Sequence, residues 1–519
     1  MNKIFNKVPV EIHNKSGFDL SHQNLYTMKC GTLYPVLVDQ LIPGDTVSLG
    51  HITEVQLPPM ATDFYGRVQF KIEVFFCPNR LCYGGWQNFI THPVNDSYLD
   101  PANTVKYLPS LPIRNSQDLV RGSLADMLGL KNLFSTGTSP LVTIKNPLPF
   151  IAYHRIWNDW YRDSLLQNRC FTEPYNTSDT TDSAAYVPYV RYRGESPQIL
   201  TDTLADGKRV TELRQRCFSK DYFTNAKLAP QYGTDTSLAF SVVDSQGSFT
   251  ISSLRAANTI QKWSERQNLA GARYIEQIKA NYGVSPSDAV LDRPVYLGSH
   301  NFDIYNKSVY KVGDSTDVST NNPMTSVGTK FSSPLGVSDS SLVDKYTVSE
   351  FGYLFVIASI VPDALYSSGD RRYLQYQTLT DFANPILSAV GDQEIRMREI
   401  SSTTLDADKT FGYTQRYSEY KFMLDEVHGE LVDGSSLDSF ALQRSFDSYV
   451  VLGSSFIEIP QNYMDQVTAV TADMSKYGAW ANTYFKYKKS SVLPAYSIPT
   501  LGEPKDTHTE IINNGGIRL

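Results

Sequence analysis

Basic and aromatic residues alternate in a short segment near the C-terminal end of the sequence. The segment comprises three lysines and three aromatic residues: Tyr484, Phe485, Lys486, Tyr487, Lys488 and Lys489. Single-stranded nucleic acid binds to surfaces of this kind, because bases stack on aromatic rings while cations meet the phosphates. A strand of an ordinary sheet has the same pattern. Lys486, Lys488, Lys489 and Tyr487 are therefore candidate contacts for single-stranded DNA, with a structural strand as the alternative.

Two local groups of carboxylates are the second candidate for chemistry. They are Asp392, Glu394 and Glu399 and, further along, Asp425 and Glu426 with His428. Paired carboxylates that face one cleft can exchange protons with a substrate or hydrolyse a glycosidic bond. Nearby arginines offer a simpler role in ion pairs, although they also suit DNA phosphates or a neighbouring chain: Arg371, Arg372, Arg396 and Arg398. We therefore interpret the carboxylates as solvated charges or ion-pair partners.

The sequence lacks the motifs that identify common active sites. It has no phosphate-binding glycine loop, no dinucleotide-binding fingerprint after a strand, no zinc-protease helix motif and no nucleophile-elbow serine. The eight histidines are scattered without ligand spacing, and the five cysteines include no C-x-x-C pair. We expect the cysteines to be reduced thiols. The sequence therefore predicts no catalysis, no cofactor and no metal site.

The charge balance of the chain is acidic. Its 519 residues carry a formal net charge of −7 and include no Arg/Lys-rich arm, although a protein that holds nucleic acid by neutralising phosphates usually has one. The 33 tyrosines suit surfaces that become buried against a partner. No run of about 18 apolar residues exists, and the first residues are too weakly apolar for a signal peptide. We therefore expect neither a membrane span nor secretion.

Alternating apolar and polar residues predict strands in the first and last thirds of the chain. The clearest run, 68–76, ends at Pro78, because proline cannot continue a hydrogen-bonded ladder. Further strands are expected at 31–38, 46–57, 346–360, 411–423 and 448–458.

Helices and polar segments separate these two sets of strands. Residues 150–166 carry one broad apolar face at helical spacing. Two more helices are expected over 253–283, interrupted at Gly271 and ended by Gly283. The remaining expectations are a polar surface segment at 168–250, a Ser/Thr-rich loop at 306–345 and an extended C-terminal tail at 507–519.

This order of elements predicts a mainly β fold. We expect one domain over residues 1–519, with insertions between its strands at 84–345. An eight-stranded double sheet with long insertions is a jelly roll, an architecture common in viral shells. Strands near both ends must then pair non-locally, as a Greek-key topology requires.

A set of short phrases in fixed order resembles the major capsid protein of the Microviridae, in particular of its gokushovirus-like branch. These phrases are Phe18-Asp19-Leu20-Ser21-His22, Pro43-Gly44-Asp45, residues 75–81, residues 156–163, Asp221-Tyr222-Phe223-Thr224, residues 293–298, Gly391-Asp392-Gln393-Glu394 and residues 411–417. Each is weak alone, but together they span about 18–460 of the chain. The resemblance implies a jelly-roll subunit of an icosahedral shell and no enzyme activity.

The resemblance also implies partners. They are other copies of the chain, a circular single-stranded DNA genome, a small basic packaging protein, minor or pilot virion proteins and a bacterial surface receptor. The location implied is the virion, assembled in the host cytoplasm. A separate packaging protein agrees with the acidic chain.

One interval departs from the family pattern. Many gokushoviruses carry a long insertion after the Asp-Tyr-Phe-Thr phrase, which builds a protrusion at the threefold axes. Here about 231–253 fills that interval, so a tall protrusion is not expected. Two alternatives stay open: a β-sandwich hydrolase or carbohydrate-binding protein, monomeric or oligomeric, and another viral shell or spike protein.

Overall fold

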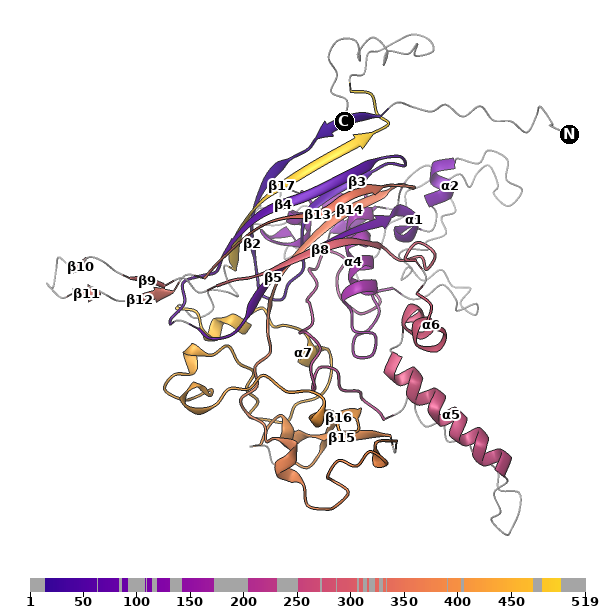
Figure 1. Ribbon diagram of the computed structural model, residues 1–519. Helices are drawn as coiled ribbons and strands as arrows, with labels where there is room; N and C mark the ends of the chain where they lie inside the picture. Colours follow the sequence, from indigo (N-terminus) through magenta and orange to yellow (C-terminus); the bar gives the residue numbers. More distant parts are fainter. Residues whose placement is uncertain are drawn as a thin grey trace, which may run out of the picture.

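The computed structural model describes most of the chain between residues 15 and 495. The described residues are 15–91, 110–113, 119–130, 142–171, 204–230, 251–305, 334–469 and 478–495, apart from short gaps, with four short strands between 308 and 332. The expected tail 507–519, and residues 172–203 and 231–250 of the expected polar segment, lie outside them. Two layers of strands lie above a region with little regular structure (Figure 1).

The first sheet, called sheet A, combines strands from both ends of the chain. Its members are β1 (Ser16–Asp19), β2 (His22–Met28), β4 (Thr46–Gln56), β13 (Leu335–Thr347) and β17 (Ala479–Ser491). β17 lies between β4 and the β1–β2 edge, and all these pairs are antiparallel. β1 and β2 pair with successive parts of β17, so they form one interrupted edge strand.

The second sheet, called sheet B, has β14 at its centre. Its members are β3 (Tyr34–Leu41), β5 (Val68–Pro78), β8 (Val295–Asp303) and β14 (Gly352–Pro362). β14 pairs with both β3 and β5, and β8 forms the far edge. Every residue of β14 is buried, which is typical of a strand covered on both faces and explains its near-continuous apolar sequence.

The order of the strands identifies the topology. Numbered from one to eight along the chain, the strands of the two sheets are β1–β2, β3, β4, β5, β8, β13, β14 and β17. In this numbering, sheet A has the order 1-8-3-6 and sheet B the order 2-7-4-5. The first and last strands are therefore neighbours. Two antiparallel four-stranded sheets interleaved in this way form a jelly roll. The prediction of a mainly β, eight-stranded jelly roll is confirmed.

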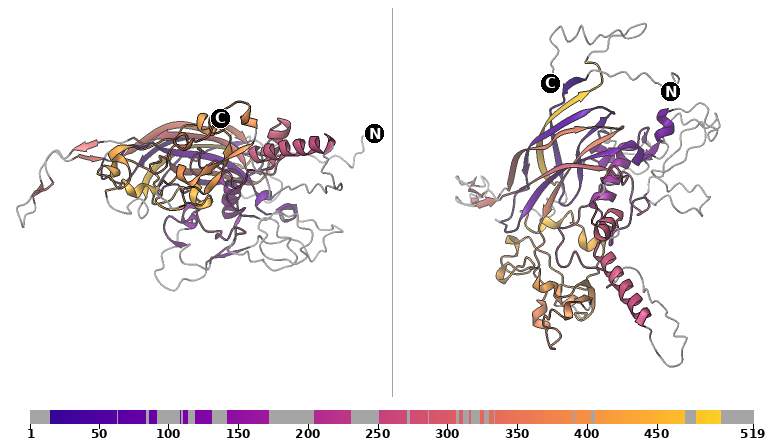
Figure 2. Two further views of the ribbon diagram at one scale, coloured as in Figure 1. Left: turned by 90° about the horizontal axis from the view of Figure 1, so that it is seen from below. Right: turned by 45° about the vertical axis from the view of Figure 1, so that its right-hand side comes forward.

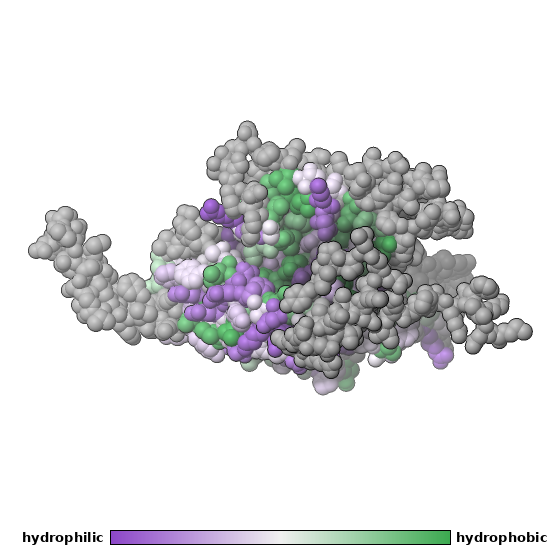
Figure 3. Space-filling view, turned by 90° about the horizontal axis from the view of Figure 1, so that it is seen from above, coloured by the Kyte–Doolittle hydropathy of each residue, from purple (hydrophilic) through white to green (hydrophobic). Residues whose placement is uncertain are grey.

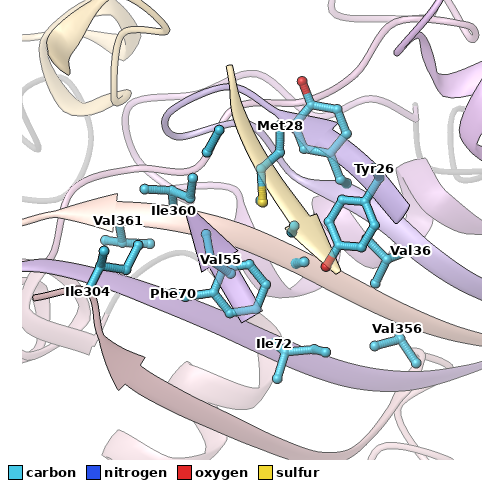
Figure 4. Packing of buried hydrophobic residues seen from close by; sticks show 14 of the residues in the cluster. Tyr26, Met28, Val36, Val55, Phe70, Ile72, Ile304, Val356, Ile360 and Val361 are labelled. Atoms are coloured by element: carbon cyan, nitrogen blue, oxygen red, sulfur yellow. The ribbon is translucent and has the colours of Figure 1, made fainter. Parts of the chain in front are cut away.

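The main hydrophobic core fills the space between the two sheets. Val55 of sheet A and Phe70, Ile72 and Val356 of sheet B are buried there, and Figure 4 shows these side chains packed between the strands. Burying one such side chain stabilises the fold by roughly 1.5–3 kcal/mol. The sandwich is therefore held mainly by contacts between strands far apart in sequence.

The long β5–β8 connection covers the outer face of sheet B. Its elements are α1 (Asn79–Cys82), α2 (Trp86–Thr91), β6 (Leu111–Ile113), α3 (Leu124–Met127), β7 (Val142–Ile144), α4 (Leu148–Ile156), a π-helix (Trp157–Tyr161), α5 (Ile251–Ala270) and α6 (Tyr274–Tyr282). A second core forms where Ile151 and Tyr153 of α4 pack against Phe75 and Phe355 of sheet B. Sheet B is thus buried on both faces.

The helix expected at 150–166 ends early. Its π-helical turn stops at Tyr161. The Asp163 Oδ1 atom then accepts hydrogen bonds from the backbone N–H groups of Leu165 and Leu166, both at 2.9 Å. A short carboxylate that binds nearby backbone donors competes with the helix, so the chain turns here.

The prediction of a loop at 306–345 is wrong at the C-terminal end of that range. That range contains β9 (Ser308–Tyr310), β10 (Ser315–Thr316), β11 (Pro323–Thr325) and β12 (Lys330–Ser332), and β13 begins at Leu335. β13 is an edge strand whose outward residues include Asp339 and Ser341 and whose inward ones include Gly336. Small and polar residues on both faces hide the alternation that would have revealed a strand.

A second long insertion, between β14 and β17, replaces two expected strands. It contains β15 (Asp392–Arg396), β16 (Thr410–Gln415), α7 (Ser454–Ile457) and 3₁₀ turns at 372–375, 387–389, 397–399, 418–420, 429–431, 438–440 and 463–466. The strand expected at 448–458 is wrong, and that expected at 411–423 ends at Gln415. Phe411 of β16 and Phe456 of α7 both fill a separate small core outside the two main sheets.

Candidate interaction surfaces

β17 divides the predicted DNA-contact residues between its two faces, because successive side chains of a strand point to opposite sides. Lys486 and Lys488 are exposed on the outer face of sheet A. Tyr487 is buried inside the sandwich, and the side chain of Lys489 is only 14% exposed. The structure therefore brings together two of the four predicted residues and separates the other two.

The two inward residues connect the sheets. Tyr487 donates a hydrogen bond to the Oδ2 atom of Asp39 on β3 at 2.7 Å, and the Lys489 Nζ atom donates to the same oxygen at 2.9 Å. Lys489 also lies 3.8 Å from the buried Asp45 carboxylate. Burial, reinforced by Asp39, raises the pKa of Tyr487. These contacts give Tyr487 and Lys489 a structural role.

The two outward lysines face carboxylates. The Lys486 Nζ atom lies 2.7 and 2.9 Å from the two oxygens of Asp339 on β13. Lys488 pairs in register with Asp19 of β1, whose pKa is lowered first by hydrogen bonds from Ser21 and also by Lys488. The outer face of sheet A is therefore not a basic patch.

Aromatic side chains are the other component of this outer face. Trp480 and Tyr484 are 42% and 43% exposed, and strand geometry places residues four apart at about 13 Å. Ile52 lies beside Tyr484 in the register of β4, and Leu25 of β2 is 72% exposed. We define this surface, with Lys486 and Lys488, as the open face. Residues 121–127, which include α3, lie beside the end of this face that carries Leu25 and Trp480. Among the described elements, none covers the rest of the face as α4 covers sheet B.

The predicted carboxylate groups form ion pairs within the chain. Glu399 lies 2.9 Å from the Arg372 guanidinium and accepts a hydrogen bond from the Tyr222 hydroxyl at 2.8 Å. Burial raises the pKa of Glu399, and Arg372 opposes that shift. Further ion pairs are Lys227–Asp392, Arg371–Glu426, Arg396–Glu394 and Arg398–Asp408. The interpretation as ion-pair partners is confirmed for Asp392, Glu394, Glu399 and Glu426.

The described residues form no site for metal binding or for thiol chemistry. Within them, no group of three or more His, Cys, Asp or Glu side chains has the geometry to hold a metal ion. The five cysteines are free, and four of them are buried. Burial raises the pKa of Cys170 and Cys217 to about 12. Of the helices described, none is long and apolar enough to cross a membrane.

An apolar hollow between the β14–β17 connection and residues 222–223 of the β5–β8 connection was not anticipated from the sequence. It has a volume of about 620 Å³, and its lining includes Tyr222, Phe223, Tyr366, Tyr373, Leu374, Tyr420, Phe422 and Met423. Leu374 is 70% and Met423 is 89% exposed. Exposed apolar patches of this kind mark interaction sites. The only sequence signal is two short pairs, Tyr373-Leu374 and Phe422-Met423, in a segment without periodicity.

Helix α5 is the third exposed feature. Both ribbon views show it projecting away from the sandwich (Figure 2), and α6 is the described element against which it packs. Its Trp263 is 57% exposed.

Seen from above, hydrophobic residues also gather near the centre of the molecule's surface (Figure 3). Apolar side chains are thus exposed on several sides of this chain.

The comparisons with known proteins agree on one class. A family model described as capsid protein (F protein) matches residues 6–245 and 240–501. The chain is 25% identical to capsid protein VP1 of Chlamydia phage 1, with 96% of this chain and 98% of the relative covered. It is 26% identical to capsid protein VP1 of Bdellovibrio phage phiMH2K, with 88% and 90% covered. It is 23% identical to capsid protein VP1 of Spiroplasma virus 4, with 96% and 100% covered.

Proposed function

Because this chain belongs to the family of F-type phage capsid proteins and is a structural virion component rather than an enzyme, we propose that its copies close into an icosahedral shell around a circular single-stranded DNA genome. The observation that carries the proposal is the jelly-roll sandwich with apolar side chains exposed on the open face, around the hollow and on α5. Contiguous apolar surface that is exposed in one chain marks a site of interaction with other chains. Closed symmetry would bury them between copies.

The test of this shell is direct. The full chain is expressed and purified, and particles are imaged by electron microscopy over a range of salt and pH. We expect closed particles of uniform size that protect single-stranded DNA from nuclease when they are recovered from infected cells. A chain that stays a monodisperse monomer under all conditions, and is absent from virions, contradicts the proposal.

The open face is our proposed contact for the genome. Trp480 and Tyr484 offer stacking surfaces that accept any base, and Lys486 and Lys488 lie on the same side of β17. Three carboxylates also lie on this face: Asp19, Glu54 and Asp339. Stacking, rather than neutralisation of phosphates, is therefore the expected source of affinity here.

A double variant tests the open face. Trp480→Ala with Tyr484→Ala should weaken binding of a labelled 20-nucleotide oligothymidine by about tenfold or more, since each stacked base contributes about 1–3 kcal/mol. The matched control is Val337→Ala, which trims an aliphatic side chain, 61% exposed, on the neighbouring part of the face. Affinities are measured by fluorescence anisotropy. Equal affinities for the double variant and the control would show that the open face does not contact DNA.

The remaining partners are also part of the proposal. The chain's net charge of −7 leaves most genome charge to be neutralised by another component, which supports a separate small basic packaging protein. Minor or pilot virion proteins, attachment to a bacterial receptor and assembly in the host cytoplasm complete it. The alternative of a hydrolase or carbohydrate-binding protein loses its support, because the relatives are named as capsid proteins.

A further inference from the structure

We propose that the apolar hollow of one copy binds helix α5 of a second copy, with Trp263 inserted among the aromatic side chains that line it. This inference rests on the proposed shell, because it needs two copies held side by side. It assigns partner surfaces to two features that the jelly roll itself does not require.

Helix α5 has the properties of a segment that docks into a partner. Its 20 residues span about 30 Å, and it projects away from the sandwich (Figures 1 and 2). Trp263 is 57% exposed, and the half-buried Ile260 lies three residues before it. Residues three apart share one face of a helix. Tryptophan is the residue type most enriched among those that dominate binding energy at protein interfaces.

The hollow has the size and chemistry to receive such a side chain. Its volume of about 620 Å³ lies within the range of about 300–1,000 Å³ typical of ligand pockets. Tyr222, Phe223 and Tyr366 are buried at its base, whereas Leu374 and Met423 are exposed at its rim. An aromatic base with a flexible apolar rim suits an indole ring, which gains from edge-to-face packing.

The two surfaces have opposite charge. The α5 sequence carries three basic residues and one acidic residue: Arg255, Lys262, Arg266 and Glu265. The lining of the hollow has four acidic residues and two basic ones: Asp370, Glu399, Glu419, Glu426, Arg371 and Arg372. Complementary charge favours this pairing over contact between two hollows or two helices, which would place like charges together.

We assign the partner to another copy, because within one chain α5 projects away from the sandwich (Figures 1 and 2) and packs against α6. A helix of one copy in the hollow of the next is a head-to-tail contact, and such contacts form rings when the rotation between copies closes. A shell built from one chain contains contacts of this type around its symmetry axes.

Engineered cysteines test the pairing. The double variant Trp263→Cys with Leu374→Cys lacks the indole ring, so it is assembled at a protein concentration well above that needed by wild type. It should then form disulfides between copies within the particles, which appear as a ladder of multimers on a non-reducing gel. The native cysteines interfere little, because four of the five are buried. The matched control is Trp263→Cys with Val337→Cys, which pairs the same helix with an exposed site on the open face and should give no ladder.

A second variant measures the contribution of the indole ring. Trp263→Ala should raise the protein concentration needed for assembly at least tenfold, and Trp263→Phe should restore part of that loss. The circular dichroism spectrum and thermal midpoint of the unassembled chain should be unchanged, since Trp263 is mostly exposed in the single copy.

The outcomes separate the two proposals. Two results would overturn this pairing and leave the proposed shell intact. One is particles of the Trp263→Cys, Leu374→Cys double variant that give no ladder, and the other is normal assembly by Trp263→Ala. A ladder from the Val337→Cys control as strong as that from the hollow would also overturn it. Failure of the wild-type chain to form any particle would overturn both proposals.

Discussion

Mild acid should weaken the jelly roll through His51, which lies on the inner face of β4 between the two sheets. Its side chain is fully buried. The Nδ1 atom lies 2.8 Å from the Thr53 Oγ1 atom, and the Nε2 atom has no hydrogen-bond partner among the described residues. Burial, with a smaller effect from the His300 ring at 5.4 Å, lowers the pKa of His51 from 6.5 to about 4.

The direction and size of the effect follow from this shift. Because the folded state holds the proton less tightly than the unfolded state, the stabilising contribution of His51 is fully present above pH 6.5 and is lost as the pH falls toward 4. A shift of about 2.5 pH units corresponds to roughly 3 kcal/mol in total, of which about 2 kcal/mol is lost between pH 7 and pH 5. Carboxylates with ordinary pKa values change little in that interval, so His51 can be isolated.

The assay is urea unfolding of the unassembled chain at pH 7 and pH 5. The free energy of unfolding of wild type should fall by about 2 kcal/mol more than that of His51→Gln, which keeps a polar side chain but cannot titrate there. The matched control is His22→Gln, which makes the same substitution at an exposed position. Parallel pH profiles for wild type and His51→Gln would refute the reasoning.

Two further predictions concern backbone strain and a buried cation. Gly31→Ala should lower the free energy of unfolding by about 3 kcal/mol, because Gly31 has φ +67° and a Cβ atom there would lie 2.5 Å from that of Ile459; Gly207→Ala, with φ +81° and open space, should lose only about 1 kcal/mol. Equal thermal midpoints for the two variants would contradict this expectation. Arg444→Met should destabilise the 363–469 connection by about 3 kcal/mol, because the guanidinium lies 4.3 Å from the Phe456 ring and donates to the Phe456 carbonyl at 2.5 Å. Hydrogen exchange should accelerate in that connection before it does in the sandwich, and uniform protection would contradict the prediction.

Strands with regular alternation were predictable from the sequence, and irregular ones were not. β4 buries every second residue along its whole length, so its period of two is visible locally. In β5, apolar and polar residues alternate in the sequence from Val68 to Val74, although the structure buries most residues of both faces. β13 places small and polar residues on both faces, and its identity depends on pairing with β4 across nearly 300 residues. The apolar run near 456 was mistaken for a sheet strand, and the strand that begins near 411 was predicted too long, because a small core and a sheet need the same residue types.

The interaction surfaces show the same division. The sequence correctly indicated ion pairs for Glu394, Glu399 and Glu426 with Arg396, Arg372 and Arg371, the arginines singled out from the sequence. It did not indicate Lys227 as the partner of Asp392. It did not reveal the hollow, because residues near 222, 373 and 422 converge only through the fold. No local sequence pattern indicates that these residues lie close together in the fold.

The sequence by itself determined the family, the mainly β class and the alternation of residues along β17. Only the tertiary structure decided which of the alternating residues are available to a partner. Tyr487 and Lys489 meet Asp39 inside the sandwich, whereas Lys486 meets Asp339 on its surface. A period of two is a property of one strand, but its inner and outer sides are set by strands more than a hundred residues away. Burial and charge pairing therefore depend on long-range packing that a linear pattern does not contain.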